Sequence, residues 1–140
     1  KGITTLGPHN MASVSRKDDE AAKAYGTNVV SLRRFRTIGA AAALAHIPDG
    51  ERVYVSIDID SFDPSIAPGT ATISHGGFTY YEAKDLLREV ARRFEVVGVD
   101  FVEVSPPYDP SGITSLLAAR TSLDFIGSIF HERARRHGSR

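Results

Sequence analysis

Two aspartates spaced two residues apart are the side chains of this sequence best suited to chemistry. Asp58 and Asp60 lie in residues 53–60, where apolar and polar residues alternate. This alternation predicts a strand, on which residues two apart point to the same face about 6.5–7 Å apart. Asp is depleted in strands, and two like charges on one face repel each other. We therefore expect the pair to hold a cation at the strand end.

The Asp-x-Asp pattern alone leaves other interpretations open. Aspartates at a strand end can cap the following turn, and short acidic pairs also occur in phosphatases and glycosyltransferases. A phosphate-handling enzyme would be expected to carry Thr or Val directly after the pair and a glycine loop that cradles phosphate. Ser61 and Phe62 follow instead, so we consider a phosphate-handling enzyme the weakest of these interpretations.

A long loop follows the pair. Asp63-Pro64, Pro68-Gly69 and Gly76-Gly77 are combinations that interrupt regular structure. Long loops at strand ends tend to carry function. Within the loop, Asp63 is expected to form a turn and not to bind a ligand. His75 is expected at the surface without a role.

A third acid, Glu103, lies near the end of the apolar segment Glu95–Val104, which is predicted to be a strand. Ser105-Pro106-Pro107 follows, and no central strand could continue through two prolines. Glu103 could form a salt bridge to a helix or cap the next helix. It could also be a buried carboxylate awaiting a cationic ligand, such as a guanidinium, which pairs with a carboxylate through two hydrogen bonds.

Strand and helix patterns alternate along the whole chain. Strands are expected at Gly2–Leu6, at Thr27–Ser31, from Val53 to Asp60 and at Glu95–Val104. Helices are expected at Arg16–Tyr25, from Leu32 to His46 with an interruption at Gly39, from Ala83 to Phe94 behind a Thr79/Glu82 capping box, and from Ile113 to Phe130. The basic tail 131–140 is expected to fray. This order predicts an α/β fold with one parallel sheet and helices on both faces. Ligands of such sheets bind beyond the carboxyl ends of the strands, where Asp60 and Glu103 are both expected.

The composition excludes several classes of function. Lys+Arg and Asp+Glu each number 17, so the net charge is zero, which argues against nucleic-acid or membrane-surface binding by bulk charge. The absence of cysteine excludes disulfides and thiol chemistry and fits a cytoplasmic location. No apolar run is expected to cross a bilayer. The chain opens on Lys1 with a strand-like run, and we expect it to be the C-terminal part of a longer chain.

Two longer motifs resemble the ureohydrolase family, which includes arginase, agmatinase and related guanidino hydrolases. Ser-Ile-Asp-Ile-Asp is followed at fixed spacing by Pro64, Pro68-Gly69 and Gly77. Gly-Val-Asp-Phe-Val-Glu-Val-Ser-Pro-Pro-Tyr-Asp resembles a second stretch of the family. Gly-Ile-Thr-Ser-Leu-Leu-Ala-Ala, which comes soon after, is closest to the agmatinase-like branch. The resemblance implies a three-layer αβα fold with a mostly parallel sheet, arginase/deacetylase-like, of which residues 1–140 form the C-terminal part of a single domain.

The resemblance also implies roles for individual residues. It implies metal-dependent hydrolysis of agmatine or a similar guanidino compound to urea and an amine, with two Mn²⁺ ions in each full-length active site. The implied metal ligands are Asp58 and Asp60, the implied catalytic and guanidinium-orienting residue is Glu103, and the further implied substrate-binding residues are Thr72, His9 and Asn10. Ala71 and Ile73 replace a glycine and a proline that are frequent in the family, so the path of this loop is expected to differ.

The other metal ligands of the family lie in two motifs that this sequence lacks. One is a histidine after two glycines, and the other is Asp-x-His-x-x-x-Asp. Two carboxylates contribute to a two-metal site but hardly hold one, so this chain alone is expected to be inactive. The alternative is a metal-incompetent fragment or interaction module. The resemblance further implies a small guanidino substrate and a homo-oligomer, trimer or hexamer, without nucleic-acid or membrane partners.

Overall fold

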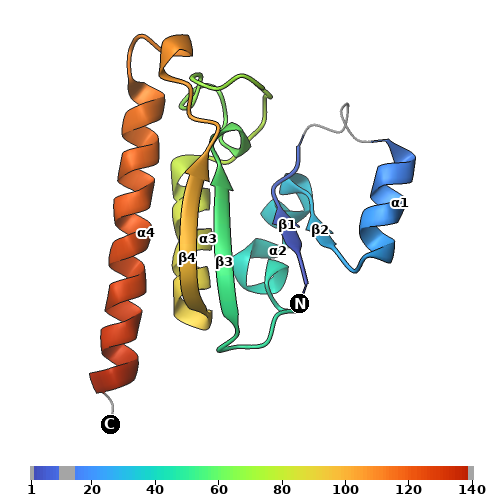
Figure 1. The fold of residues 1–140 in the computed structure, drawn as a ribbon, viewed down its shortest axis with the longest axis vertical. Coiled ribbons are helices and arrows are strands. Elements are labelled where there is room, and N and C mark those ends of the chain that lie inside the picture. Colours follow the sequence, from blue (N-terminus) through green and yellow to red (C-terminus); the bar gives the residue numbers. More distant parts are fainter. Residues whose placement is uncertain (1, 10–14, 139–140) are drawn as a thin grey trace.

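The structure is a computed structural model that describes residues 2–9 and 15–138 of the chain. Strands and helices alternate along it, and all of the strands pair in parallel. Figure 1 shows the strands side by side with the long last helix along one flank. The elements are β1 (Thr4–Leu6), α1 (Arg16–Ala24), β2 (Asn28–Val30), α2 (Leu32–Ala43), β3 (Arg52–Asp58), α3 (Tyr80–Arg93), β4 (Glu95–Val102) and α4 (Ile113–Gly138). The predicted α/β class with parallel strands is therefore confirmed.

The strands of the described residues form two separate ladders. β1 pairs with β2, β3 pairs with β4, and no ladder joins β1 to β3. The predicted parallel pairing is therefore present as two ladders, and no described strand bridges the facing edges of β1 and β3 (Figure 1). In Figure 1 all four strands nevertheless point their carboxyl ends toward the same end of the molecule.

Local sequence signals account for most helix boundaries. Thr79 and Glu82 form the predicted capping box of α3, and Ser15 caps α1 in the same way with Asp18. Gly39 interrupts α2 as predicted, with a φ of 77° that favours a residue without a Cβ. These caps satisfy backbone N–H groups that a helix leaves unpaired at its start.

The hydrophobic core lies between β3–β4 and the helices packed on it. Its most buried large side chains include Ile59, Phe62, Phe94 and Phe125, each at most 2% exposed. Helices α3 and α4 pack along each other and both contact β4. Tyr54 of β3 is 63% exposed, so within the described residues the sheet side that carries Tyr54 is open.

Three predicted ends differ from the structure. β3 ends at Asp58 because residues 59–61 turn into a short 3₁₀ helix, and β4 ends at Val102 because Glu103 adopts a φ of 62°. The tail was expected to fray from residue 131, but α4 continues to Gly138. Guanidinium groups anchor this end, because Arg133 and Arg136 donate to backbone carbonyls of β4 and of the α3 end.

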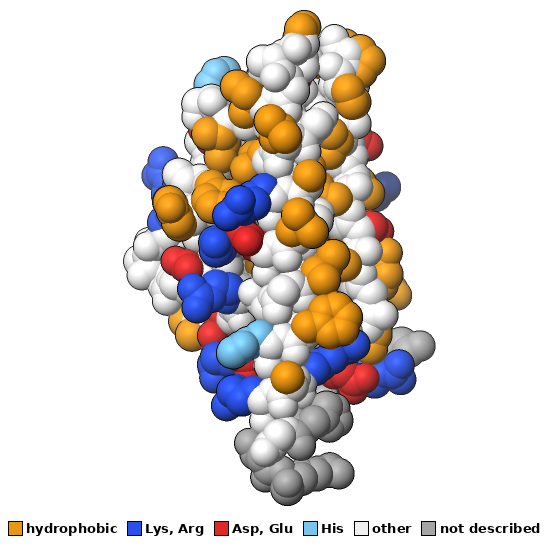
Figure 2. All heavy atoms as spheres, turned by 90° about the vertical axis from the view of Figure 1, so that its left-hand side faces the viewer, with side chains coloured by type: hydrophobic (Ala, Val, Ile, Leu, Met, Phe, Trp, Pro, Cys, Tyr) orange, Lys and Arg blue, Asp and Glu red, His pale blue; other side chains and the backbone are white. Residues whose placement is uncertain are grey.

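The outer side of α4 carries large apolar side chains. Leu116, Leu123 and Phe130 repeat every seven residues and are 63–70% exposed, and Figure 2 shows apolar side chains following this helix. The helical segment 113–136 is long and apolar enough to cross a membrane. An 18-residue stretch within it has a mean hydropathy of 1.2, and 22% of that stretch is buried. The expectation that no segment has this length and hydropathy is therefore wrong. Core helices of soluble proteins also meet this criterion, so it assigns no membrane role.

Candidate functional site

Four of the predicted site residues converge on one cavity at the carboxyl ends of the strands, and Glu103 is not among the residues that line it. Asp58 ends β3, Asp60 lies in the 3₁₀ helix directly after it, and both line a cavity of about 270 Å³ together with His9 and Thr72. The other lining residues come from the end of β1 and from the loop after β3: Thr5, Leu6, Gly7, Pro8, Ser61 and Ser74. Four residues that the sequence spreads over positions 9–72 are therefore neighbours in space.

The two aspartates reach the cavity by a different route from the one predicted. Because the strand ends at Asp58, the pair does not lie on one strand face, and that prediction is wrong. Asp58 accepts a hydrogen bond from the Asp60 backbone N–H at 3.1 Å and so caps the 3₁₀ helix, as the alternative interpretation held. The Ser61 hydroxyl donates to the Asp58 carbonyl at 2.7 Å and tightens the same turn. The turn brings both carboxylates to the same cavity.

The cavity is crowded with negative charge. Partial burial, followed by the charge and the hydrogen bond of neighbouring Asp58, raises the pKa of Asp60 to about 6. The charge of Glu103 acts in the same direction, and that of His9 opposes it. A cation in this cavity would relieve the repulsion between the carboxylates.

Glu103 follows β4 on the same rim as Asp58. The register pairs Asp58 with Val102, so Glu103 is one residue beyond the position opposite Asp58. Its φ of 62° is uncommon for a residue with a side chain, and such backbone conformations concentrate at functional sites. One of the two interpretations made Glu103 a buried carboxylate, but Glu103 is exposed because the turn after Val102 carries it out of the strand. The buried position is therefore wrong for the chain as described.

His9 connects the β1 exit to the loop after β3. One ring nitrogen, Nδ1, is 3.0 Å from the Gly7 carbonyl, and Nε2 is 3.2 Å from the Ser74 carbonyl. A neutral imidazole has one N–H, so it donates to one of these carbonyls at a time. His9 thus lines the cavity between the end of β1 and the loop after β3, and its substrate-tail role stays a prediction. Asn10, the other residue predicted there, lies outside the described residues.

The loop of residues 62–78 has its two ends fastened together. The Phe78 N–H donates to the Ser61 carbonyl at 2.8 Å, and the Asp63 N–H donates to the Phe78 carbonyl at 3.0 Å. Asp63 accepts from the backbone N–H groups of Ser65 and Gly76, which confirms it as a turn former. The hydrogen bonds of Ser65 and then Gly76 lower the pKa of Asp63 to about 2. The loop segment that carries Thr72 therefore has a fixed base.

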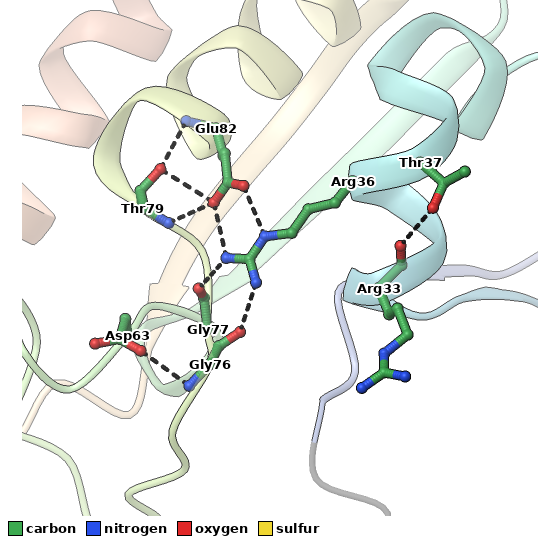
Figure 3. Close-up of polar contacts among 8 residues, drawn as sticks. All are labelled: Arg33, Arg36, Thr37, Asp63, Gly76, Gly77, Thr79 and Glu82. Atoms are coloured by element: carbon green, nitrogen blue, oxygen red, sulfur yellow. Dashed lines mark hydrogen bonds and ion pairs between the residues drawn. The ribbon is translucent and has the colours of Figure 1, made fainter.

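Arg36, which the sequence analysis did not single out, also holds the end of this loop. Its guanidinium donates to the Glu82 carboxylate from Nε at 2.8 Å and from Nη2 at 3.1 Å. It also donates to the carbonyls of Gly76 and Gly77. Figure 3 shows the guanidinium reaching from α2 to the capping box of α3 and to this loop end. No local pattern could have predicted these contacts, because the residues that Arg36 contacts lie 40–46 positions away from it in the sequence.

The donor set suits part of a metal site. Asp58 and Asp60 offer oxygen ligands of the kind that hard divalent cations bind, and the raised pKa of Asp60 reflects negative charge that such a cation would balance. Across residues 2–9 and 15–138, however, no three His, Cys, Asp or Glu side chains are grouped to hold a metal ion. The described chain thus fits two ligands of a site that needs more.

The family profile described as Arginase family matches residues 3–127, so the chain belongs to the arginase family. A guanidinopropionase from Pseudomonas aeruginosa is 38% identical over 127 residues, which cover 88% of this chain and 40% of that protein. An agmatinase from Bacillus subtilis is 36% identical over 132 residues, covering 90% of this chain and 44% of that protein. The membership predicted from the sequence is confirmed.

Solved structures of the family share the fold. Agmatine ureohydrolase of Thermoplasma volcanium superimposes with a TM-score of 0.80 at 31% identity, over 96% of this chain and 44% of that one. Proclavaminate amidino hydrolase from Streptomyces clavuligerus gives a TM-score of 0.75 at 36% identity, over 94% and 43%. The chain thus spans less than half the length of these relatives, and the arginase-type fold is confirmed over that part.

Proposed function

We propose that the protein to which this chain belongs hydrolyses a guanidino compound, agmatine or a similar one, to urea and an amine. The observation that carries the proposal is the convergence of Asp58, Asp60, Thr72 and His9 on one cavity, in a chain of the arginase family. The names of its relatives, guanidinopropionase, agmatinase and proclavaminate amidinohydrolase, agree with this kind of reaction.

Asp58 and Asp60 are assigned to hold divalent metal ions, and we propose two Mn²⁺ ions, together with ligands from outside the described residues. When bound, such ions lower the pKa of a water molecule and make it nucleophilic at neutral pH. The chain's own negative charge at this rim favours a cationic ligand over an anionic one. Those ions would offset the charge of the carboxylates, so the case against the phosphate alternative rests on Ser61 and Phe62, which follow the pair in place of Thr or Val.

Glu103 is assigned to the guanidinium. A carboxylate accepts two parallel hydrogen bonds from a guanidinium, which would fix the orientation of the reacting carbon. Thr72 is assigned to the same group from the opposite loop, and His9 to the tail of the substrate, with Asn10 beside it in sequence. In each case the role is positional, because an oriented substrate needs less reorganisation to react.

The test uses the complete protein and three single substitutions. Asp58→Asn is expected to lower metal content and activity together. Glu103→Gln is expected to spare metal content and to weaken turnover of a guanidino substrate. Asp85→Asn removes an exposed carboxylate on α3 that does not line the cavity and is the matched control. Wild-type activity in either of the first two variants would count against the assignment.

A second candidate is a chain that holds no metal and has no catalysis of its own. It is favoured by the lack of a three-ligand group in the part of the chain that the structure describes. Metal analysis after purification in the presence of manganese separates the two proposals, because two ions for each copy of the 140-residue chain would contradict this one. We further propose a cytoplasmic homo-oligomer, a trimer or hexamer, without nucleic-acid or membrane partners. Light scattering of the complete protein tests the oligomer.

A further inference from the structure

Gly69 lies in the loop of residues 62–78 and forms hydrogen bonds with two other segments of the chain. Its backbone N–H donates to the Thr114 hydroxyl oxygen at 2.8 Å, near the start of α4. Its carbonyl accepts from the Ser105 N–H at 2.8 Å, in the segment that follows β4. Ser105 is two residues beyond Glu103, and Thr72 is three residues beyond Gly69. One buried residue therefore links the segments of both proposed guanidinium-binding side chains.

Asp109 holds the backbone of Thr114, the residue whose hydroxyl oxygen accepts from Gly69. Its Oδ2 accepts from the Thr114 backbone N–H at 2.7 Å, and its Oδ1 accepts from the N–H and hydroxyl of Ser111. Asp109 is 6% exposed and Thr114 is 1% exposed. The hydrogen bonds from Ser111, then those from Thr114, hold the pKa of Asp109 at about 2, so it is ionised at neutral pH. The first turn of α4 is thereby held in one orientation.

The contact at Gly69 leaves no space for a side chain. A Cβ at this position would be 2.8 Å from the Cβ of Asp109 and 2.9 Å from the Thr114 hydroxyl oxygen. A gap of this size accommodates the backbone alone, so the loop cannot shift toward α4. The hydrogen bonds on its two sides oppose movement in other directions.

We propose that Thr114 and Asp109 are positioning residues for the substrate, which act through Gly69 to hold the Thr72 loop in register with the Glu103 segment. This inference rests on the proposed function, since it concerns the same guanidinium. Neither residue lines the cavity, so they act on the substrate only through the loops that they hold. Displacing an orienting group by about 1 Å can cost on the order of a hundredfold in rate, so a single lost tie is measurable.

The test compares three variants of the complete protein. Thr114→Val keeps the shape of the side chain and removes the acceptor for Gly69, whereas Thr114→Ser keeps the hydroxyl. Thr121→Val is the matched control, because Thr121 is on the same helix, is 2% exposed, and has a hydroxyl without a hydrogen-bond partner. We expect Thr114→Val to raise KM about tenfold or more with unchanged metal content, Thr114→Ser to restore most of the loss, and Thr121→Val to match the wild type.

Two readouts separate positioning from general stability. Wild-type kcat/KM in folded Thr114→Val would overturn the inference, as would equal losses in Thr114→Val and Thr121→Val. Hydrogen exchange measures the tie without any substrate: amides of residues 69–77 should exchange faster in Thr114→Val than in Thr121→Val, while those of α3 stay unchanged. If the wild type hydrolyses no guanidino compound, the proposed function fails. Hydrogen exchange then tests only whether the Gly69–Thr114 hydrogen bond holds the loop. Equal exchange of residues 69–77 in Thr114→Val and Thr121→Val would refute that it does.

Discussion

Replacing Arg36 with Met should destabilise the protein by an amount that depends on pH. The hydrogen bonds from Arg36 are the largest of the effects that lower the pKa of Glu82 from 4.5 to about 2. A shift of about 2.5 units corresponds to about 3.4 kcal/mol at neutral pH, as an upper limit. The side chains of Arg36 and Glu82 are 42% and 28% exposed, so solvent screening reduces the contribution of this ion pair to stability to about 1–2 kcal/mol.

The substitution also removes the donor to the Gly77 carbonyl, which Arg36 reaches at 2.9 Å. Gly77 is buried, so its carbonyl is poorly placed to find water, and this loss adds about 1 kcal/mol. The total expected for Arg36→Met is about 2–3 kcal/mol at pH 7, measured by urea unfolding. Arg33→Met is the control, because its side chain lies on the same helix but points away from this cluster in Figure 3. It should change stability by less than about 0.5 kcal/mol.

The pH dependence tests the electrostatic part separately. The folded-state pKa of Glu82 is lower than its unfolded value of 4.5, so ionised Glu82 stabilises the fold above pH 4.5. This contribution is lost as pH falls from 4.5 through about 2, where Glu82 is protonated. The stability difference between wild type and Arg36→Met should therefore shrink over that window. A difference that stays constant with pH, or an equal loss in Arg33→Met, would refute the reasoning.

Three further predictions concern the scaffold. Gly7→Ala should destabilise by about 1–3 kcal/mol in thermal unfolding, because φ is +89° and a Cβ would lie 2.2 Å from the Phe78 ring. Asp109→Asn should remove a stabilising contribution that the wild type has above pH 3.8 and loses as pH falls through about 2; identical urea midpoints across that range in both proteins would contradict this. Phe125→Ala, at 1% exposure, should cost about 3–5 kcal/mol of unfolding free energy, whereas Leu116→Ala, at 70% exposure, should cost under about 0.5 kcal/mol; similar losses would be evidence against the described core.

The sequence was sufficient to place the acidic residues on one rim. Period-two alternation located both strands, and parallel pairing puts their carboxyl ends together, so Asp58 and Glu103 were predicted near each other from local patterns. The same patterns could not predict that β3 ends at Asp58. Ile59 continues the alternation, yet its side chain is fully buried within a 3₁₀ turn, because core packing decides the local backbone there.

Contacts between distant segments were outside the reach of sequence patterns. A shift of pairing between Val53 and Tyr54 inserts a bulge into β4, so Val96 and Phe101 both pack against the core despite their odd spacing. The tie from Gly69 to Thr114 spans 45 residues. Each residue of that tie is common in turns and helix starts, so only the fold shows that they meet.

The sign of the charge at the rim indicates which ligands suit the Asp-x-Asp pair. Asp58, Asp60 and Glu103 all act on the same small region, and their mutual effect already raises the pKa of Asp60. Divalent cations would offset this charge, and a guanidinium is the kind of cation with which a carboxylate such as Glu103 pairs. His9 is the basic group that acts on Asp60, and a single positive charge would not outweigh three carboxylates. The electrostatics of the described residues thus favour cations at this rim, beginning with the metal ions that the two aspartates are proposed to hold.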